Sequence, residues 1–246
     1  MEYEIDGVKI PLHDDWHRIA ISVSGGADSA LLAWLLCIIA KEVNPKISIH
    51  VISHTRMWKT RPWQEYDSKK VYDYISSKFN FFNWYRHTNF IAPDVEYGNM
   101  GPVIEDEYGK MVSGDNAQIR SFSEYICHHS KIDAYYNAVT RNPKTSGIVG
   151  MKERDVDPTE DNKHLRLMKH MHGYAVHPFR FVEKSWVIQQ YKRLGLMDLF
   201  NITRSCEGEF PDLNYRSYRR GDKVPTCGEC FWCKERDWAI AEIFKS

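Results

Sequence analysis

The sequence has no excess of charge of either sign. Lys and Arg together number 33, as do Asp and Glu, so the formal net charge is zero. Proteins that grip tRNA or duplex DNA usually carry a basic excess concentrated on one face. The balance therefore disfavours a nucleic-acid partner and favours a small-molecule substrate. The local cluster Arg216, Arg219 and Arg220 is interpreted as part of a solvated loop.

Long apolar runs are missing as well. No run reaches the roughly 18 to 20 residues that a membrane span needs. The first residues, Met-Glu-Tyr-Glu, are acidic and lack the basic and then apolar pattern of a secretory signal. With 43 % apolar and 27 % charged residues, the composition is that of an ordinary soluble globular protein. We therefore expect a cytoplasmic protein without a membrane partner.

Cysteine is scarce over most of the chain and concentrated near its end. Four of the six cysteines lie in the last 41 residues, namely Cys206, Cys227, Cys230 and Cys233. Two successive C-x-x-C steps and one distant cysteine supply four thiolates, enough for a closed tetrahedral zinc site. The spacing predicts such a metal site, and it leaves an iron–sulfur cluster and a disulfide pair open as alternatives.

Apolar runs and turn signals alternate in a way that is typical of an α/β protein. The first unit is a buried strand at 17–23, a buried helix from residue 28 to 40 and a second strand at 47–52. Further strands are predicted at 81–87, 132–139 and 174–176, and further helices at 61–78, 116–130 and 185–193. The charged or glycine-rich stretches 93–114 and 142–172 are predicted as long functional or mobile loops. The expected fold is a doubly wound parallel sheet.

A glycine-rich turn joins the first strand to its helix and reads Ser24-Gly25-Gly26-Ala27-Asp28-Ser29. Free N–H groups at a helix N-terminus bind anions, and glycines let a phosphate approach the backbone closely. Ser24 and Ser29 add hydroxyl donors, and Asp28 is expected either to cap the helix or to help hold Mg²⁺. The chain has no Walker pattern, and no dinucleotide-binding glycine pattern follows this strand, which excludes the two commonest phosphate-binding loops.

The hexapeptide resembles the S-G-G-x-D-S motif of the ATP pyrophosphatase (PP-loop) superfamily. That resemblance implies an adenine nucleotide alpha hydrolase-like fold and the use of ATP with Mg²⁺. It also implies cleavage of ATP between its α and β phosphates, which yields pyrophosphate and an adenylated intermediate. His54 and Thr55 follow the second strand, at the edge of the sheet where open α/β folds bind ligands, so we predict that they line the nucleotide pocket.

The C-terminal half resembles 7-cyano-7-deazaguanine synthases in the order of its motifs. A strand ended by Pro178 leads to a helix that begins at Lys184, then to Thr203-Arg204-Ser205-Cys206 and the cysteine triplet, with Arg236 three residues beyond. The resemblance implies that Lys184 neutralises departing pyrophosphate, the alternative being a solvated lysine. It also implies a homodimer whose subunits have a nucleotide-binding domain at 1–200 and a small zinc-binding subdomain at 201–246.

The implied activity is that of an ATP-dependent carbon–nitrogen ligase, which converts 7-carboxy-7-deazaguanine and ammonia to the 7-cyano compound. The middle of the chain departs from the family, since Asp115 replaces an arginine and the later aspartate is missing from residues 138–142. We assign Asn116, Arg120 and Arg141 to the substrate site. The alternatives are a diverged homologue acting on another carboxylate or nucleophile, a tRNA thiolation enzyme, and a nucleotide-binding protein without turnover.

Overall fold

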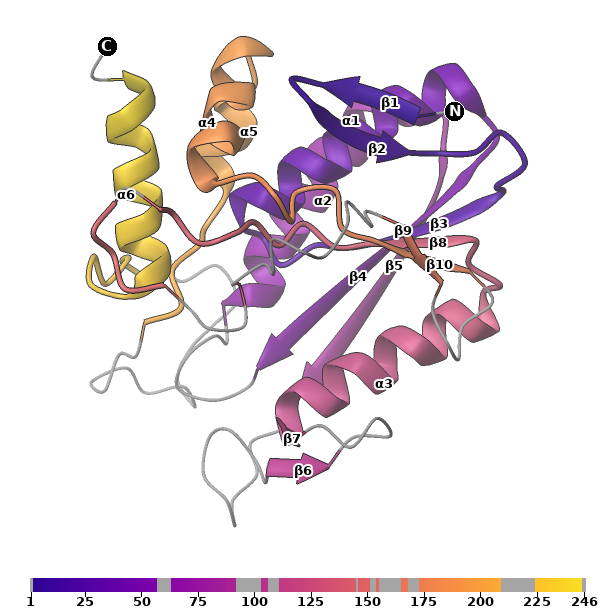
Figure 1. Ribbon diagram of the computed structural model, residues 1–246. Coiled ribbons are helices and arrows are strands. Elements are labelled where there is room, and N and C mark those ends of the chain that lie inside the picture. Colours follow the sequence, from indigo (N-terminus) through magenta and orange to yellow (C-terminus); the bar gives the residue numbers. More distant parts are fainter. Residues whose placement is uncertain are drawn as a thin grey trace.

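The structure is a computed structural model that describes most of the 246 residues. Described are residues 2–56, 63–91, 103–105, 111–144, 146–150, 154, 165–167, 173–208 and 224–244. Side chains are described for all of these except residues 2, 103–105, 111–117 and 165–167. Within this part of the chain, a central sheet lies between two unequal layers of helices (Figure 1).

The central sheet has six strands in the order β5-β4-β3-β8-β10-β9. Its parallel strands are β3 (Arg18–Ser22), β4 (Ser48–Arg56), β5 (Asn83–Ile91), β8 (Ala134–Tyr136) and β10 (Tyr174–Val176). β9 (Leu165–Leu167) pairs antiparallel with β10 at one edge. The first parallel strand lies in the middle and the strand order reverses beside it, as in doubly wound sheets. The predicted fold class is therefore confirmed.

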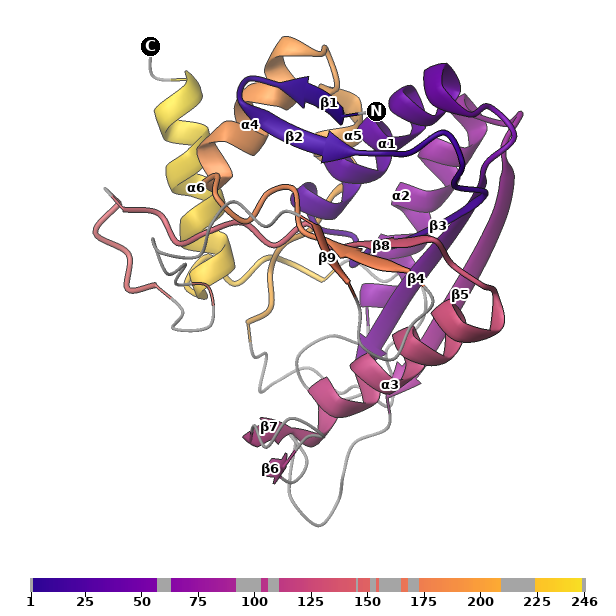
Figure 2. The same cartoon turned by 45° about the vertical axis from the view of Figure 1, so that its right-hand side comes forward.

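Helices cover both faces of this sheet (Figures 1 and 2). One face carries α1 (Ala27–Val43), α2 (Gln64–Lys78), α4 (Lys184–Arg193) and α5 (Met197–Ile202), with α6 (Phe231–Phe244) packed against α4. This layer encloses the large core, in which α1 is buried nearly all round, as its continuous apolar sequence predicts. α3 (Gly114–His129) covers the other face over a much smaller apolar cluster.

Several short elements escaped prediction. β1 (Glu2–Ile5) and β2 (Val8–Pro11) form a hairpin whose two turn residues, Asp6 and Gly7, have φ of 45° and 78°. Such an Asp-Gly turn suits the twist of a hairpin, so the signal was present in the sequence. β6 (Val103–Glu105), β7 (Met111–Ser113) and β9 correct the prediction of loops at 93–114 and 142–172, most of which lie outside the described residues. Strands of three residues are too short to show a period.

Element boundaries differ from the predictions in detail. The strand predicted at 132–139 is formed only at β8, while α2 begins at Gln64 rather than at residue 61. α4 ends as predicted before Gly195, whose φ of 67° suits a helix C-terminus. α6 packs on α4 and Ala239 belongs to the main core, so the division at residue 200 stays a prediction. None of the described helices is long and apolar enough to cross a membrane.

Candidate nucleotide and metal site

The predicted phosphate loop, residues 24–29, lies at the carboxyl end of β3, next to the point where the strand order reverses. Gly25 has a φ of 87°, and a Cβ there would lie 2.8 Å from the backbone of Asp67 and Ser68 in α2. Glycine is therefore required both by the backbone conformation and by the close approach of α2. The turn is further fixed by the Gly26 N–H, which donates to Ser24 Oγ at 3.3 Å, and by Ser29 Oγ, which donates to the Gly26 carbonyl at 3.2 Å.

The N-terminus of α1 is left without a side-chain cap. Its N-cap residue is Gly26, and no side chain in the described chain makes the capping hydrogen bond. The first N–H groups of a helix have no partner within the helix, and together with the helix dipole they attract an anion. The prediction that Asp28 caps this helix is wrong, because its carboxylate lies in the first turn and binds Lys184 instead. The uncapped end is consistent with the predicted phosphate site.

Lys184 and Asp28 belong to a row of alternating charges, in which Asp28 is partly exposed and the other three side chains are buried. The Lys184 ammonium donates to Asp28 Oδ2 and lies 3.8 Å from Glu235 Oε2, and Arg154 Nη2 donates to Glu235 Oε1 at 2.6 Å. The side chains of Lys184, Glu235 and Arg154 are 2 %, 0 % and 8 % exposed. The alternative of a solvated lysine at residue 184 is thus wrong. Two cations and two anions compensate one another, which burial of charges demands.

Glu235 and Arg154 were missed by sequence reasoning. Arg154 also donates to the Thr140 carbonyl at 2.7 Å, to Thr140 Oγ1 at 2.5 Å and to the Arg141 carbonyl at 2.9 Å. It therefore holds the chain that follows β8 against α6. The pair Arg154 and Glu235 is 81 residues apart in the sequence, and Glu235 sits in an ordinary charged stretch behind the cysteine triplet. No local pattern marks either residue.

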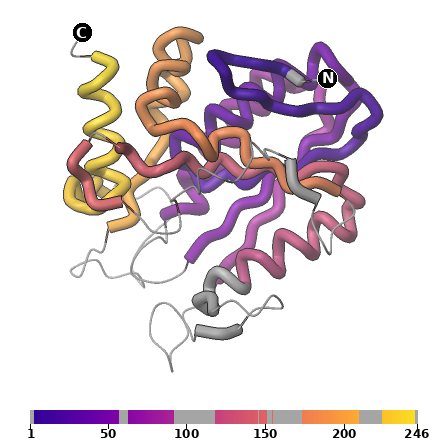
Figure 3. Tube along the Cα trace, in the orientation of Figure 1, coloured from indigo at the N-terminus to yellow at the C-terminus, as the bar shows by residue number. Residues whose placement is uncertain are grey.

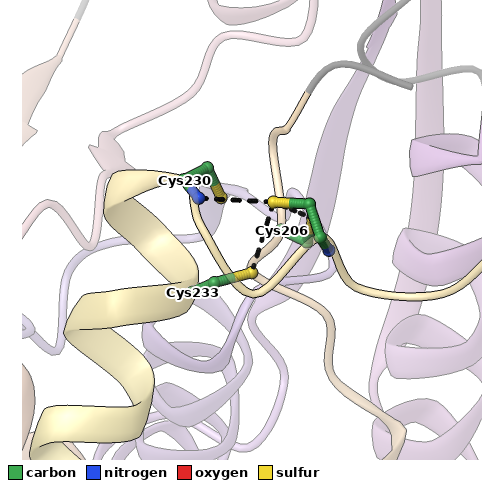
Figure 4. Close-up of side chains that lie close together, drawn as sticks. Cys206, Cys230 and Cys233 are labelled. Atoms are coloured by element: carbon green, nitrogen blue, oxygen red, sulfur yellow. Dashed lines mark hydrogen bonds between the residues drawn. The ribbon is translucent and has the colours of Figure 1, made fainter. Parts of the chain in front are cut away.

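The four C-terminal cysteines come together as predicted. Their sulfur atoms all lie within 4.8 Å of one another, with 3.6 Å between Cys206 and Cys227 and 3.9 Å between Cys227 and Cys233. Figure 4 shows Cys206, in the segment after α5, facing Cys230 and Cys233 at the start of α6. A tetrahedral ion with bonds of about 2.3 Å would separate its sulfur ligands by about 3.8 Å, so the donor set fits a single metal ion. A disulfide would need about 2.05 Å.

The surroundings of the thiols fit a metal ligand set. The Cys227 N–H donates to Cys206 Sγ and the Cys230 N–H to Cys227 Sγ, both at 3.3 Å. A hydrogen bond shared with Cys206, together with burial, raises the pKa of Cys230 to about 12. Burial is the main cause that raises the pKa of Cys233 to about 11. Metal binding to Cys230 and Cys233 would therefore release protons, whereas the hydrogen bond with Cys230 lowers the pKa of Cys206.

The segment just before Cys206 lies on the phosphate loop. The Arg204 N–H donates to the Gly25 carbonyl at 2.8 Å, and a Cβ on Gly26 would lie 3.7 Å from Ser205 Oγ. Arg236 from α6 donates to the Thr203 carbonyl and hydroxyl at 3.2 and 3.1 Å. Figure 3 shows this stretch running from α5 toward the start of α6. We call residues 203–206 the strap, because this segment lies across the phosphate loop although the two are nearly 180 residues apart in the sequence. Its last residue, Cys206, belongs to the cysteine cluster.

His54 and Thr55 lie at the end of β4 but face opposite sides of the sheet, as pleating requires. His54 Nε2 is 3.2 Å from Ser123 Oγ in α3, and His54 Nδ1 is 3.4 Å from Asn89 Nδ2. Burial, with a smaller effect of Arg56, lowers the pKa of His54 to about 4. No hydrogen bond joins His54 to the phosphate loop within the described chain. Thr55 is fully buried and its Oγ1 has no partner there.

The three residues assigned to the substrate do not meet in one place. Arg120 forms an ion pair with Glu124 at 3.4 Å on α3, on the other face of the sheet from Lys184. Arg141 pairs with Glu183 at 3.2 Å, next to Lys184 along the chain. Asn116 is in the first turn of α3, and its side chain lies outside the described residues. Arg141 is thus linked through Glu183 to the neighbour of Lys184 in the chain, and the substrate role of all three residues stays a prediction.

Comparison with known proteins gives similarity at the level of structure alone. A scan against protein-family models and a search of curated proteins found no match. The U34-tRNA thiolase NcsA from Methanococcus maripaludis, solved with its [4Fe-4S] cluster, is 15 % identical with a TM-score of 0.46, over 82 % of this chain and 62 % of that one. NAD+ synthetase from Burkholderia pseudomallei is 11 % identical with a TM-score of 0.39, over 82 % of this chain and 71 % of that one. The chain spans less than two thirds of the thiolase.

Proposed function

We propose that this chain is an ATP-dependent carbon–nitrogen ligase that adenylates a carboxylate and releases pyrophosphate. The substrate that we propose is 7-carboxy-7-deazaguanine, which ammonia would convert to 7-cyano-7-deazaguanine. The observation that carries the first statement is the uncapped N-terminus of α1 behind Gly25 and Gly26, with the buried ammonium of Lys184 on Asp28 one turn away. The deazaguanine substrate rests on the resemblance in the C-terminal motifs.

The chemistry requires a site that binds phosphates and stabilises a leaving pyrophosphate. A carboxylate oxygen attacks the α phosphorus, the bond to the β phosphate breaks, and pyrophosphate leaves with the electron pair. Ammonia then displaces AMP from the acyl carbon to give an amide, and a second ATP activates the amide oxygen, so that loss of AMP and a proton gives the nitrile. Backbone N–H groups at the start of α1 and the charge of Lys184 favour each departure electrostatically.

A magnesium ion fits the same place. Asp28 Oδ1 is buried and has no hydrogen-bond partner among the described residues, which leaves a hard oxygen donor beside the phosphate loop. Mg²⁺ when bound would share the negative charge of the phosphates. Asp28 thus has two oxygens with separate tasks: Oδ2 orients Lys184, and Oδ1 remains for a cation.

For the cysteine cluster we propose one zinc ion with a structural role. A single ion accounts for the separations of 3.6 and 3.9 Å between neighbouring sulfurs. In a [4Fe-4S] cluster each thiolate binds a different iron and the sulfurs lie farther apart. The ion would hold Cys206 to α6, and with it the strap at 203–206 on Gly25 and Gly26. Metal analysis of protein purified without oxygen, by mass and by visible absorption, distinguishes zinc from iron.

The decisive experiment is a product assay. The protein is incubated with ATP, Mg²⁺, ammonium and 7-carboxy-7-deazaguanine, and nucleotides and deazapurines are measured together by mass. We expect two AMP for each nitrile formed, and loss of both products in Lys184→Met. A matched control is Lys46→Met, which changes an exposed lysine beyond the C-terminal end of α1.

Other outcomes select other functions. AMP that forms only with different acids would identify a diverged homologue, which the separation of Arg120 from Arg141 favours as the second candidate. Sulfur transfer to tRNA would identify a thiolation enzyme. ATP binding without AMP would identify a protein that has lost turnover. The homodimer remains a prediction that sedimentation can test.

A further inference from the structure

Glu235 is a fully buried carboxylate on α6 that the proposed reaction does not use. Its Oε1 accepts from Arg154 at 2.6 Å, and its Oε2 lies 3.8 Å from the Lys184 ammonium, with no hydrogen-bond partner in the described chain. A buried charge is costly unless something compensates for it. A carboxylate held between two cations, one of them at the phosphate loop, therefore calls for a role beyond packing.

Lys184 lies between two carboxylates and is bonded to only one of them. Asp28 belongs to α1, which follows the phosphate loop, whereas Glu235 belongs to α6, which carries Cys233 and begins directly after Cys230. Arg154 neutralises Glu235 and thereby limits its pull on the ammonium. Since the four charges sum to zero, removing any one of them leaves a net charge inside a region that water screens poorly.

From this arrangement we propose that Glu235 and Arg154 are positioning residues that set the position of the Lys184 ammonium and the net charge around it, and thereby the affinity of the loop for anions. The proposal rests on the proposed function, in which Lys184 meets the pyrophosphate. Without Arg154, Glu235 draws Lys184 away from Asp28 and adds a net negative charge. Without the Glu235 charge, Lys184 stays on Asp28 and the site gains a net positive charge.

The two substitutions must then shift anion binding in opposite directions. Glu235→Gln should tighten the binding of inorganic pyrophosphate, and Arg154→Gln should weaken it, each by about fivefold, the lower end of the range for coupled sites. The double variant should return near the wild-type value. In Glu235→Gln, Arg154 keeps three acceptors, the carbonyls of Thr140 and Arg141 and the Thr140 hydroxyl, and the new amide oxygen can still accept from it. The new amide NH2 replaces Oε2, which has no hydrogen-bond partner in the described chain, so the stability of this variant is measured beside its affinity.

The measurement is calorimetric titration of the purified, metal-loaded chain with ATP and separately with pyrophosphate, which needs no turnover. Glu242→Gln, an exposed glutamate on the same helix, is the matched control and should shift neither affinity. A purely structural role would instead lower affinity and stability together in both variants, and shifts of the same sign would overturn the proposal. In a Lys184→Met background the Glu235 substitution should lose most of its effect on pyrophosphate.

A failure of the proposed function can be told apart from a failure of this inference. If the wild-type chain binds neither ATP nor pyrophosphate, the proposed ligase function is wrong. The interaction between Lys184 and Glu235 is then tested by itself. Urea unfolding of Lys184→Met, Glu235→Gln and the double variant then measures whether the two side chains are coupled. Coupling supports the positioning of Lys184 by Glu235, and additive effects refute it.

Discussion

Substitution of Gly25 by alanine tests the geometry of the phosphate loop. The backbone there has a φ of 87°, a conformation that costs an alanine about 1–2 kcal/mol. The new Cβ would also lie 2.8 Å from three atoms of α2: the carbonyl carbon and the Cβ of Asp67 and the backbone nitrogen of Ser68. The backbone of a helix cannot move aside as a flexible side chain can. We expect this crowding to add about 1–3 kcal/mol, the usual cost of overpacking.

Two other glycines provide matched controls. Gly7 and Gly195 have φ of 78° and 67°, and nothing lies within 4 Å of a Cβ at either position among the described residues. Alanine there should cost only the conformational part, about 1–2 kcal/mol. The quantity of interest is therefore the difference in unfolding free energy between Gly25→Ala and the two control variants.

Urea unfolding followed by circular dichroism gives this difference, and titration with ATP on the same samples gives the functional effect. We expect Gly25→Ala to be the least stable of the three variants and to lose ATP affinity, because α2 or the strap must move. The controls should keep wild-type affinity. Equal stability of all three variants, within about 0.5 kcal/mol, would refute the close approach of α2 to the loop.

Three further predictions follow from the site. Removing the metal with a chelator, or by Cys233→Ser, should both lower the melting temperature and weaken ATP binding, because Cys206 anchors the strap. Unchanged ATP affinity in the metal-free protein would contradict this expectation. Lys184→Met should abolish AMP formation more than ATP binding, by at least about 10²-fold in rate, as measured by single-turnover assays. Burial lowers the pKa of His54 to about 4. Burial, together with the charges of His87 and Arg18, also lowers the pKa of His50 to about 4. The unfolded chain therefore binds more protons, so stability should be full above about pH 6.5 and fall progressively toward pH 4, with a smaller fall in His54→Gln.

The unit around β3 could be predicted closely from sequence because its signals are local and strong. A continuous apolar strand, two glycines and a helix that is apolar on every side leave few alternatives, and β3, the loop and α1 form where expected. The cysteine cluster could be predicted for the same reason, since three of its ligands lie within seven residues. Where the informative residues follow one another closely in the sequence, the local sequence allows few alternative structures.

The ligand roles assigned to His54 and Arg120 stay predictions, because the structure shows only which protein groups these side chains contact. His54 lies at the expected edge of the sheet, yet the pleat of β4 turns it toward Ser123 and α3, and a shift of one residue decides between the two faces. Arg120 has its own partner one turn away in Glu124, which a helical i,i+4 spacing permits and which substrate assignment overlooked. Such choices depend on tertiary neighbours that a single sequence does not reveal.

The strap explains why two separate motifs belong to one site. Gly25 and Gly26 are contacted by α2 and by the strap, and the loop is also held from α4, where the Tyr191 hydroxyl donates to the Ala27 carbonyl at 2.7 Å. The strap has no regular secondary structure, so its order depends on what holds its ends. At one end are α5 and Arg236, which donates to Thr203, and at the other end is Cys206. Under the proposed function, a metal bound at the cysteines would therefore influence phosphate binding through the hydrogen bond from the Arg204 N–H to the Gly25 carbonyl.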